Sequence, residues 1–280
     1  MLAVPADRGI RPLLFYFVLA NLLSWTAWAP LAAAGMGWTS SQFSPELHLL
    51  GGLGPLIAAA GVTYASEGRT GLARLAERST RLRGRCGWVA LSVAGPMLLF
   101  GVSALGLRIG AGMDVDWSEI GRSNEYPDLS RPEYWLANVF FYGFGEEVGW
   151  RGFALPRIQA RTSAFNSALL VGCAWASWHL PLFAFAGGLS AMGVGAIAGW
   201  LFSIMTGSIV MTWLFNSSGG SVLGVALFHG VLDILMASPV RSPLPSVMGA
   251  LIVLFGMALL RLYGRENLSR SPKIKDQTVA

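Results

Sequence analysis

The feature that most constrains this chain is the spacing of its charged residues. Six stretches contain no Asp, Glu, Lys or Arg, at 12–45, 47–66, 86–107, 134–145, 162–232 and 242–260. A helix needs about 20 mostly apolar residues to cross a hydrocarbon core of about 30 Å, so the fifth stretch alone is long enough for three crossings. Of the 280 residues only 12% are charged, compared with about 25% in an ordinary soluble domain. The sequence therefore predicts an integral membrane protein.

Proline, glycine and small polar residues divide these stretches into successive helices, because such residues mark connections in otherwise apolar sequence. We expect about eight helices, at 12–34, 48–66, 86–108, 133–153, 164–185, 190–215, 218–237 and 243–262. The predicted fold class is all-α, a polytopic transmembrane helical bundle. We expect a single bundle domain at 1–265, with its functional core at about 133–237, followed by a polar, frayed cytoplasmic tail at 266–280.

The distribution of Lys and Arg predicts the orientation, because short cytoplasmic loops accumulate these residues. With the N-terminus placed inside, the inner side collects 16 of them, six of which are arginines between 69 and 85. The outer side collects 4, namely Arg108, Arg122, Arg131 and Arg241. Both termini are therefore predicted to be cytoplasmic, in a bacterial inner or plasma membrane. The same asymmetry accounts for the net charge of +5, which needs no nucleic-acid partner to explain it.

A group of charges falls inside one of the predicted spans, in the sequence FGEEVGWRGF at 144–153. Glu147 and Arg151 are four residues apart, in the favoured order for an ion pair on one helical face. Glu146 points about 100° away and lacks that partner. Ionisable groups inside a membrane are costly and usually mark function. From this motif alone, a helix end in headgroup water and a functional site are equally good interpretations.

Two of the three histidines also lie inside predicted spans, His179 in WASWHLPLF and His229 in LFHGVLD. Asp233 follows His229 by four residues, so the two side chains share a helical face. A single intramembrane histidine usually serves helix packing. Three helices that each carry such groups favour a shared polar cavity, in which the groups offset one another's desolvation.

This set of residues suits hydrolysis of a peptide bond, which needs an activated water and donors for the oxyanion. Glu146 with His179 could activate the water, while His229 could donate to the oxyanion with Asp233 orienting it. The same four residues, Glu146, His179, His229 and Asp233, could instead hold zinc, which lowers the pKa of bound water. The first mechanism needs no cofactor, and the sequence does not separate the two. The zinc motif HExxH is absent, as are paired aspartates within the predicted spans.

The order of these motifs resembles the type II CAAX prenyl endopeptidase family, also called the CPBP or Abi family of intramembrane proteases. EEVGWR matches the family pattern EExxxR, WASWH corresponds to FxxxH with Trp175 in place of Phe, and HGVLD matches HxxxD. The resemblance covers about 133–237. It departs at Asp233, where many members have Asn, so this side chain would be protonated, orient His229 or bind metal.

The resemblance implies a function for each motif. Glu146 would be the general base and His179 its partner on the water, with Glu147 and Arg151 as a supporting pair. His229 and the residue at 233 would stabilise the oxyanion. The implied activity is hydrolysis of a membrane-associated or prenylated peptide or protein in the bilayer, by a glutamate or metalloprotease mechanism. Two alternatives stay open: a non-catalytic immunity or scaffold protein, and a proton-coupled transporter, since such groups also form proton relays.

Overall fold

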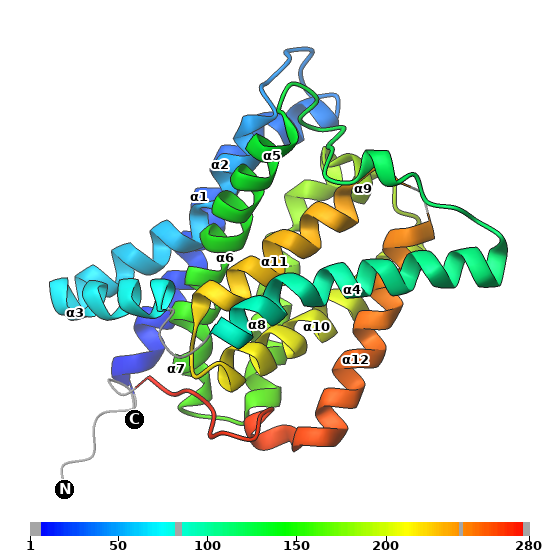
Figure 1. Cartoon of the computed structure of the whole chain (residues 1–280). Coiled ribbons are helices and arrows are strands. Elements are labelled where there is room, and N and C mark those ends of the chain that lie inside the picture. Colours follow the sequence, from blue (N-terminus) through cyan, green and yellow to red (C-terminus); the bar gives the residue numbers. More distant parts are fainter. Residues whose placement is uncertain (1–6, 82–85, 241–242, 277–280) are drawn as a thin grey trace, which may run out of the picture.

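A computed structural model describes residues 7–81, 86–240 and 243–276 of the chain. Arg83, Arg85 and Arg241 of the predicted charge asymmetry, and tail residues 277–280, lie outside the described residues. Throughout the described ranges the secondary structure is helical and contains no strand. The predicted all-α bundle is therefore confirmed (Figure 1).

The helices follow the charge-free stretches of the sequence. The first half of the chain forms α1 (Asp7–Gly35), α2 (Glu46–Gly52), α3 (Gly54–Thr80), α4 (Cys86–Ala111) and a short 3₁₀ helix (Trp117–Glu119). The next helix, here called the motif helix, runs through α5 (Arg131–Asn138), a π-helical turn (Val139–Phe144), α6 (Gly145–Glu147), a second π-helical turn (Val148–Ala154) and α7 (Leu155–Gln159). The remainder forms α8 (Ala164–Trp178), a 3₁₀ helix (Leu180–Ala184), α9 (Gly187–Ser190), α10 (Val194–Ser217), α11 (Val222–Ala237) and α12 (Pro243–Asn267).

Within the described residues, six helical segments are long and apolar enough to cross a membrane. They correspond to α1, α2 with α3, α4, α8 with its 3₁₀ extension, α10 and α12. The other two predicted spans are the motif helix, which combines several short helical pieces, and α11, which is apolar but shorter. The chain is a multi-pass helical membrane protein, and each of the eight expected segments is helical.

The second predicted span continues beyond residue 66, where we expected a loop. The helix α3 bends sharply at Gly68, whose φ of 65° lies in the left-handed region that favours glycine. Residues 69–80, here called the arm, turn back beside the first part of α3 (Figure 1). A Cβ atom on Gly71 would lie only 2.4 Å from Cβ of Glu67, which shows how closely the two parts approach.

The motif helix lies between α3 and α11, against which glycine allows close backbone packing. A Cβ atom on Gly143 would lie 2.5 Å from the carbonyl oxygen of Ala226 in α11. A Cβ atom on Gly149 would lie 2.7 Å from the carbonyl oxygen of Pro55 in α3. Small residues at such contacts let membrane helices approach closely without a hydrophobic driving force. This packing fixes the position of the two glutamates between the two glycines.

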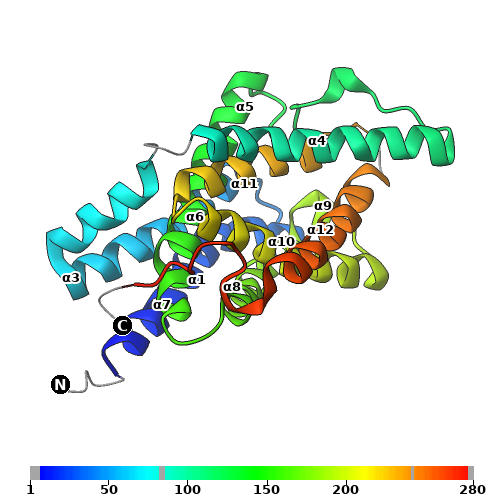
Figure 2. The same ribbon diagram turned by 60° about the horizontal axis from the view of Figure 1, so that its bottom comes forward.

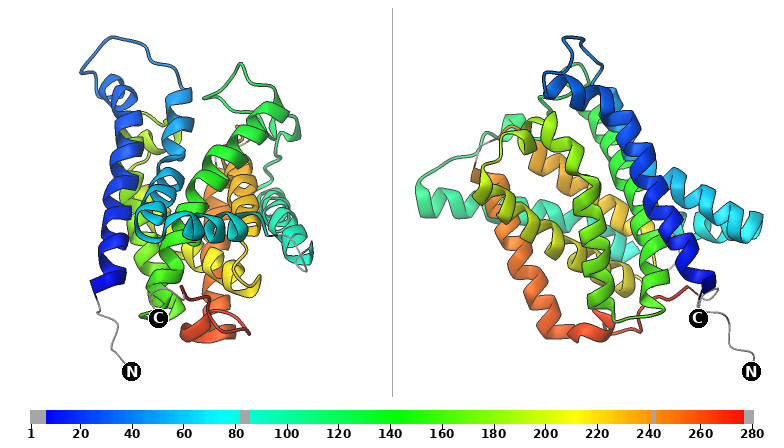
Figure 3. Two further views of the ribbon diagram at one scale, coloured as in Figure 1. Left: turned by 90° about the vertical axis from the view of Figure 1, so that its left-hand side faces the viewer. Right: turned by 180° about the vertical axis from the view of Figure 1, so that it is seen from behind.

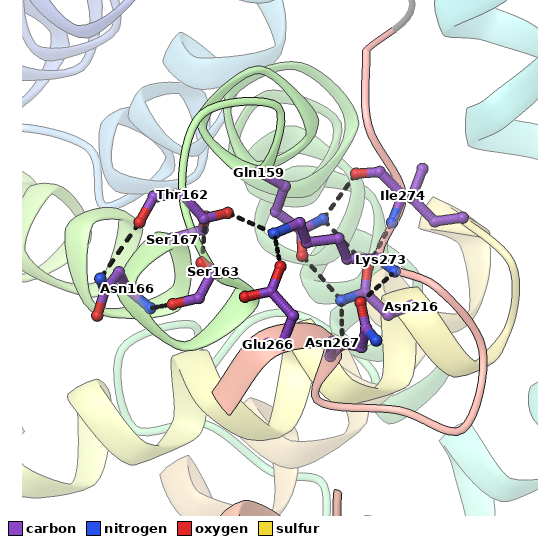
Figure 4. Close-up of polar contacts among 10 residues, drawn as sticks. All are labelled: Gln159, Thr162, Ser163, Asn166, Ser167, Asn216, Glu266, Asn267, Lys273 and Ile274. Atoms are coloured by element: carbon purple, nitrogen blue, oxygen red, sulfur yellow. Dashed lines mark hydrogen bonds and ion pairs between the residues drawn. The ribbon is translucent and has the colours of Figure 1, made fainter. Parts of the chain in front are cut away.

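The described part of the C-terminal tail packs against the bundle, contrary to the expected frayed segment. Figure 4 shows Ile274 between Gln159 and Asn216, with the Ile274 N–H donating to Asn216 Oδ1 at 3.2 Å and the Gln159 amide donating to the Ile274 carbonyl at 2.8 Å. Asp276 pairs with Arg157 at 3.1 Å. Figure 2, which brings this end of the molecule forward, shows the tail passing over α7. The polar sequence is therefore a docked strap as far as Asp276.

The described ends of the chain lie at one end of the bundle, where α1 begins and the tail docks (Figure 3). We call this the tail-side end. The tail is anchored there to α7 and α10, since it contacts Arg157, Gln159 and Asn216. The helices α8 and α11 both begin close to the tail. Just before α8, the Thr162 carbonyl accepts from Lys273 at 2.8 Å, and just before α11, Gly220 lies against Ile274.

Candidate active site

The predicted ion pair of the motif helix is present and fully buried. Arg151 donates through its guanidinium to Glu147 Oε1 at 2.7 Å, and both side chains are 0% exposed. The same carboxylate oxygen accepts from Nδ1 of His229 at 2.9 Å. Glu147 is therefore held by a cation from its own helix and by an imidazole from α11. Because an unpaired charge at such a position would be costly, the three side chains stabilise one another.

Trp175 of α8 lies at the centre of the cluster. Its indole N–H donates to Glu146 Oε2 at 2.6 Å. The Arg151 guanidinium carbon lies 5.2 Å from the centroid of the same ring, a distance that allows a cation–π interaction. Arg151 also donates to the hydroxyl of Ser208 in α10 at 3.2 Å. Trp175 thus contacts both Glu146 and Arg151 of the motif helix.

His179 caps the end of α8 and is surrounded by aromatic rings. Its Nδ1 lies 2.7 Å from the carbonyl oxygen of Trp175, a contact in which the ring N–H donates. In a neutral imidazole this leaves Nε2 as the acceptor nitrogen. The rings of Trp175, Trp178 and Trp200 lie 5.5, 5.0 and 5.8 Å from the imidazole centroid. These contacts fix the plane of the imidazole.

Asp233 is a partly exposed member of the cluster. Its Oδ2 lies 3.2 Å from Nε2 of His229, as their spacing of four residues predicts, and its side chain is 35% exposed. His229 therefore meets a carboxylate at each ring nitrogen. Both contacts are hydrogen bonds when the ring is doubly protonated, or when Asp233 carries a proton and donates it to the ring. The geometry joins Asp233 to the buried pair through His229.

The structure brings together the predicted site residues of three helices. Glu146 hydrogen-bonds to Trp175, and His179 and His229 pack against the same ring, at centroid distances of 5.5 and 5.2 Å. Glu146 and His229 are 3% and 2% exposed. Within the described part of the chain, Glu146 and His179 hydrogen-bond to the indole N–H and the carbonyl of Trp175, and not to each other. The cluster is therefore organised around the indole.

A zinc site needs several His, Cys, Asp or Glu side chains arranged around one point. Among the described residues, no group of three or more His, Cys, Asp and Glu side chains is arranged to hold a metal ion. The predicted set of Glu146, His179, His229 and Asp233 does not form such a group. Zinc stays a prediction for metal analysis of the purified protein.

Sequence reasoning missed two parts of this cluster. From the sequence, Trp175 is identified only as the residue that replaces Phe in the second motif, whereas its N–H binds Glu146. Ser208, inside a long apolar stretch, accepts from Arg151 and itself donates to the Ala168 carbonyl at 2.7 Å. An indole or a hydroxyl in an apolar span carries no charge signal, so only the packing of α8 and α10 identifies these partners.

The fold and the cluster define a class: a multi-pass helical membrane protein with buried acids, histidines and an arginine at its centre. Residues 130–235 match the family described as type II CAAX prenyl endopeptidase Rce1-like. This match contains every predicted site residue and confirms the resemblance that the three motifs indicated.

One curated relative matches a shorter part of the chain. The chain is 49% identical over 37 residues to a protein of Methanococcus maripaludis called CAAX prenyl protease 2. The aligned part is 13% of this chain and 14% of the relative.

Proposed function

We propose that this protein is an intramembrane endopeptidase that hydrolyses a peptide bond in a membrane-associated or prenylated peptide or protein. The observation that supports this most strongly is the gathering of Glu146, His179 and His229 around Trp175. These residues come from three helices and lie within the segment similar to the CAAX prenyl endopeptidases. Buried groups of this kind are costly unless they share a function.

The proposed reaction begins with a water held between Glu146 and Nε2 of His179. Glu146 takes a proton from this water while the water oxygen attacks the peptide carbonyl carbon. The C=O bond becomes a C–O⁻ single bond in the tetrahedral intermediate. Glu146 then gives the proton to the leaving amine as the C–N bond breaks and the C=O bond re-forms, which yields a carboxylic acid and an amine; the acid then loses its proton to the amine or to water. The enzyme ends the cycle in its starting protonation state.

His229 would stabilise the oxyanion through Nε2–H. That nitrogen faces Asp233 in the structure, at 3.2 Å from Oδ2. Asp233 has a partly exposed side chain and can turn aside when the oxyanion forms, whereas Nδ1 stays on Glu147. The pair of Glu147 and Arg151 holds this imidazole in place, with Nδ1 at 2.9 Å from the Glu147 carboxylate. Removal of one hydrogen-bond donor to the oxyanion lowers kcat by about 10²–10³-fold.

The test uses purified protein in lipid nanodiscs and two fluorogenic peptides, one farnesylated near its C-terminus and one identical but unmodified. Glu146→Gln should lower kcat/KM by about 10²–10⁴-fold, because it removes the general base. The matched control is Glu119→Gln in the short 3₁₀ helix before α5, where the carboxylate lies 3.9 Å from Arg122. Undiminished cleavage in the Glu146 variant would remove the proposed base. Preference for the farnesylated peptide would assign the lipidated substrate.

The zinc alternative has its own measurement. Metal content of the purified protein and the sensitivity of cleavage to a chelator would separate a metal mechanism from a glutamate mechanism. A stoichiometric metal whose removal stops cleavage would favour zinc. Full activity in metal-free protein would favour the glutamate mechanism, with Glu146 and His179 acting on the water.

A further inference from the structure

A second polar feature lies at the tail-side end of the bundle, outside the cluster around Trp175. A cleft with a volume of about 920 Å³ opens between the arm of α3 and the docked tail. Gly152 of the motif helix forms part of its wall, and Gly219 and Gly220 of the turn before α11 form another part. The cleft is large enough for a phosphate-bearing headgroup.

The charges that line the cleft are mainly positive. Six cationic side chains line it, namely Arg74, Arg78, Arg81, Arg157, Lys273 and Lys275. Three carboxylates face them, from Glu67, Glu77 and Asp276. The described lining therefore carries more cations than its own acids can neutralise.

Part of this positive charge is already paired. Arg157 contacts both Glu67 and Asp276, the latter at 3.1 Å. Arg74 pairs with Glu67 at 2.6 Å, and Arg81 with Glu77 at 3.0 Å. These pairs use all three carboxylates of the lining.

Arg78 and Lys275 supply the excess charge. Arg78 donates to the carbonyl oxygen of Gly152 at 2.7 Å, a neutral acceptor. Lys275 is exposed on the tail. The carboxylates that act on Arg78, those of Asp276 and Glu67, already pair with Arg157. Glu266, which acts on Lys275, already pairs with Lys273. The remaining guanidinium N–H groups of Arg78 are therefore available to an anion that enters the cleft.

The chemistry and the position of the cleft select the anion. The planar fork of an arginine matches the oxygens of phosphate, and two or more cations neutralise its charge. Basic pockets at the polar ends of membrane helices bind anionic lipid headgroups, and each Lys or Arg near an anionic surface contributes to that attraction. The tail-side end is also the end where Lys and Arg accumulate in the sequence.

We propose that this cleft binds a phosphate group, presented by an anionic phospholipid headgroup or as free phosphate. Arg78 and Lys275 supply the unneutralised charge from opposite walls, and the paired arginines complete the lining. This site is separate from the proposed hydrolysis and does not depend on it. Because Arg78 touches Gly152, an occupied cleft would hold the arm against the motif helix.

The experiment measures lipid retention by native mass spectrometry of the full chain, released from nanodiscs that contain equal amounts of phosphatidylglycerol and phosphatidylcholine. Arg78→Gln and Lys275→Gln should each lower retention of phosphatidylglycerol by about fivefold, the effect expected for one cation near an anionic headgroup. Arg122→Gln is the matched control, since it removes an arginine from the loop before α5 and should leave retention unchanged. Melting temperature with and without inorganic phosphate forms the second arm.

The two arms distinguish the sources of the phosphate. Selective retention of phosphatidylglycerol without stabilisation by inorganic phosphate assigns the headgroup, and stabilisation by inorganic phosphate that the variants lose assigns free phosphate. Equal retention of the two lipids, together with equal phosphate responses of wild type and variants, would overturn the proposal. If Arg78→Gln fails to fold, Lys275→Gln decides, because the side chain of Lys275 is exposed on the tail.

Discussion

Removal of the arginine from the buried ion pair should destabilise the bundle more than any surface change. Arg151→Met keeps an unbranched side chain of similar length but leaves the Glu147 carboxylate, 0% exposed, with only the His229 hydrogen bond. Charge-assisted hydrogen bonds contribute about 1.5–3 kcal/mol each. Breaking a buried pair by removing one partner costs about 3–5 kcal/mol, because the other charge stays buried. We expect a loss of unfolding free energy in that range.

The double variant tests the reasoning most sharply. Glu147→Gln removes the stranded charge, so Glu147→Gln with Arg151→Met should be less destabilised than the sum of the single variants by about 1–3 kcal/mol. Reversible unfolding in mixed detergent micelles gives the free energies, and Arg122→Gln, whose exposed pair has an N–O distance of 3.9 Å, serves as the control. Single variants within about 1 kcal/mol of wild type, or fully additive effects, would refute a mutually dependent buried pair.

Three further predictions concern the Trp175 hydrogen bond, the docked tail and the orientation in the membrane. Trp175→Phe keeps the ring but removes the donor to Glu146, so kcat/KM for the peptide substrate should fall by about tenfold, and an unchanged value would show that the N–H does not position the carboxylate. Arg157→Gln removes the pairing of α7 with Asp276, and limited proteolysis should then cut the tail faster than in wild type; equal rates would contradict docking through this pair. For the proposed orientation, alkaline phosphatase fused after Asn124 should be active and a C-terminal green fluorescent protein should fluoresce, and the opposite pattern would reverse the topology.

Much of the fold could be predicted because a membrane imposes a simple rule on sequence. Charge-free stretches long enough to cross it are visible without any structure, and all eight expected segments are helical. The bend at Gly68 was not visible, since glycine is common in apolar helices and only its φ of 65° reveals the turn. The arm that follows carries arginines and reads as a loop by composition, although it remains helical to Thr80.

The candidate site was predictable where spacing along one helix determines contact. Glu147 with Arg151 and His229 with Asp233 are pairs of this kind, and both contacts are present. Contacts between helices were not predictable, because they depend on how the helices pack. The bond of Glu146 to Trp175 and the docking of Asp276 on Arg157 join distant parts of the chain through groups whose partners spacing cannot identify.

The close backbone contacts of the motif helix have a consequence for how a substrate could be admitted. At Gly143 and Gly149 the neighbouring main chains leave no space for even a methyl group, so rotation of this helix would drive larger side chains into Ala226 and Pro55. The motif helix is therefore expected to keep its position between α3 and α11. The helix α10 instead meets the cluster through side chains, with Ser208 on Arg151 and Trp200 on His179. We therefore expect a substrate to be admitted by rearrangement of side chains on α10, with the glutamates kept in place.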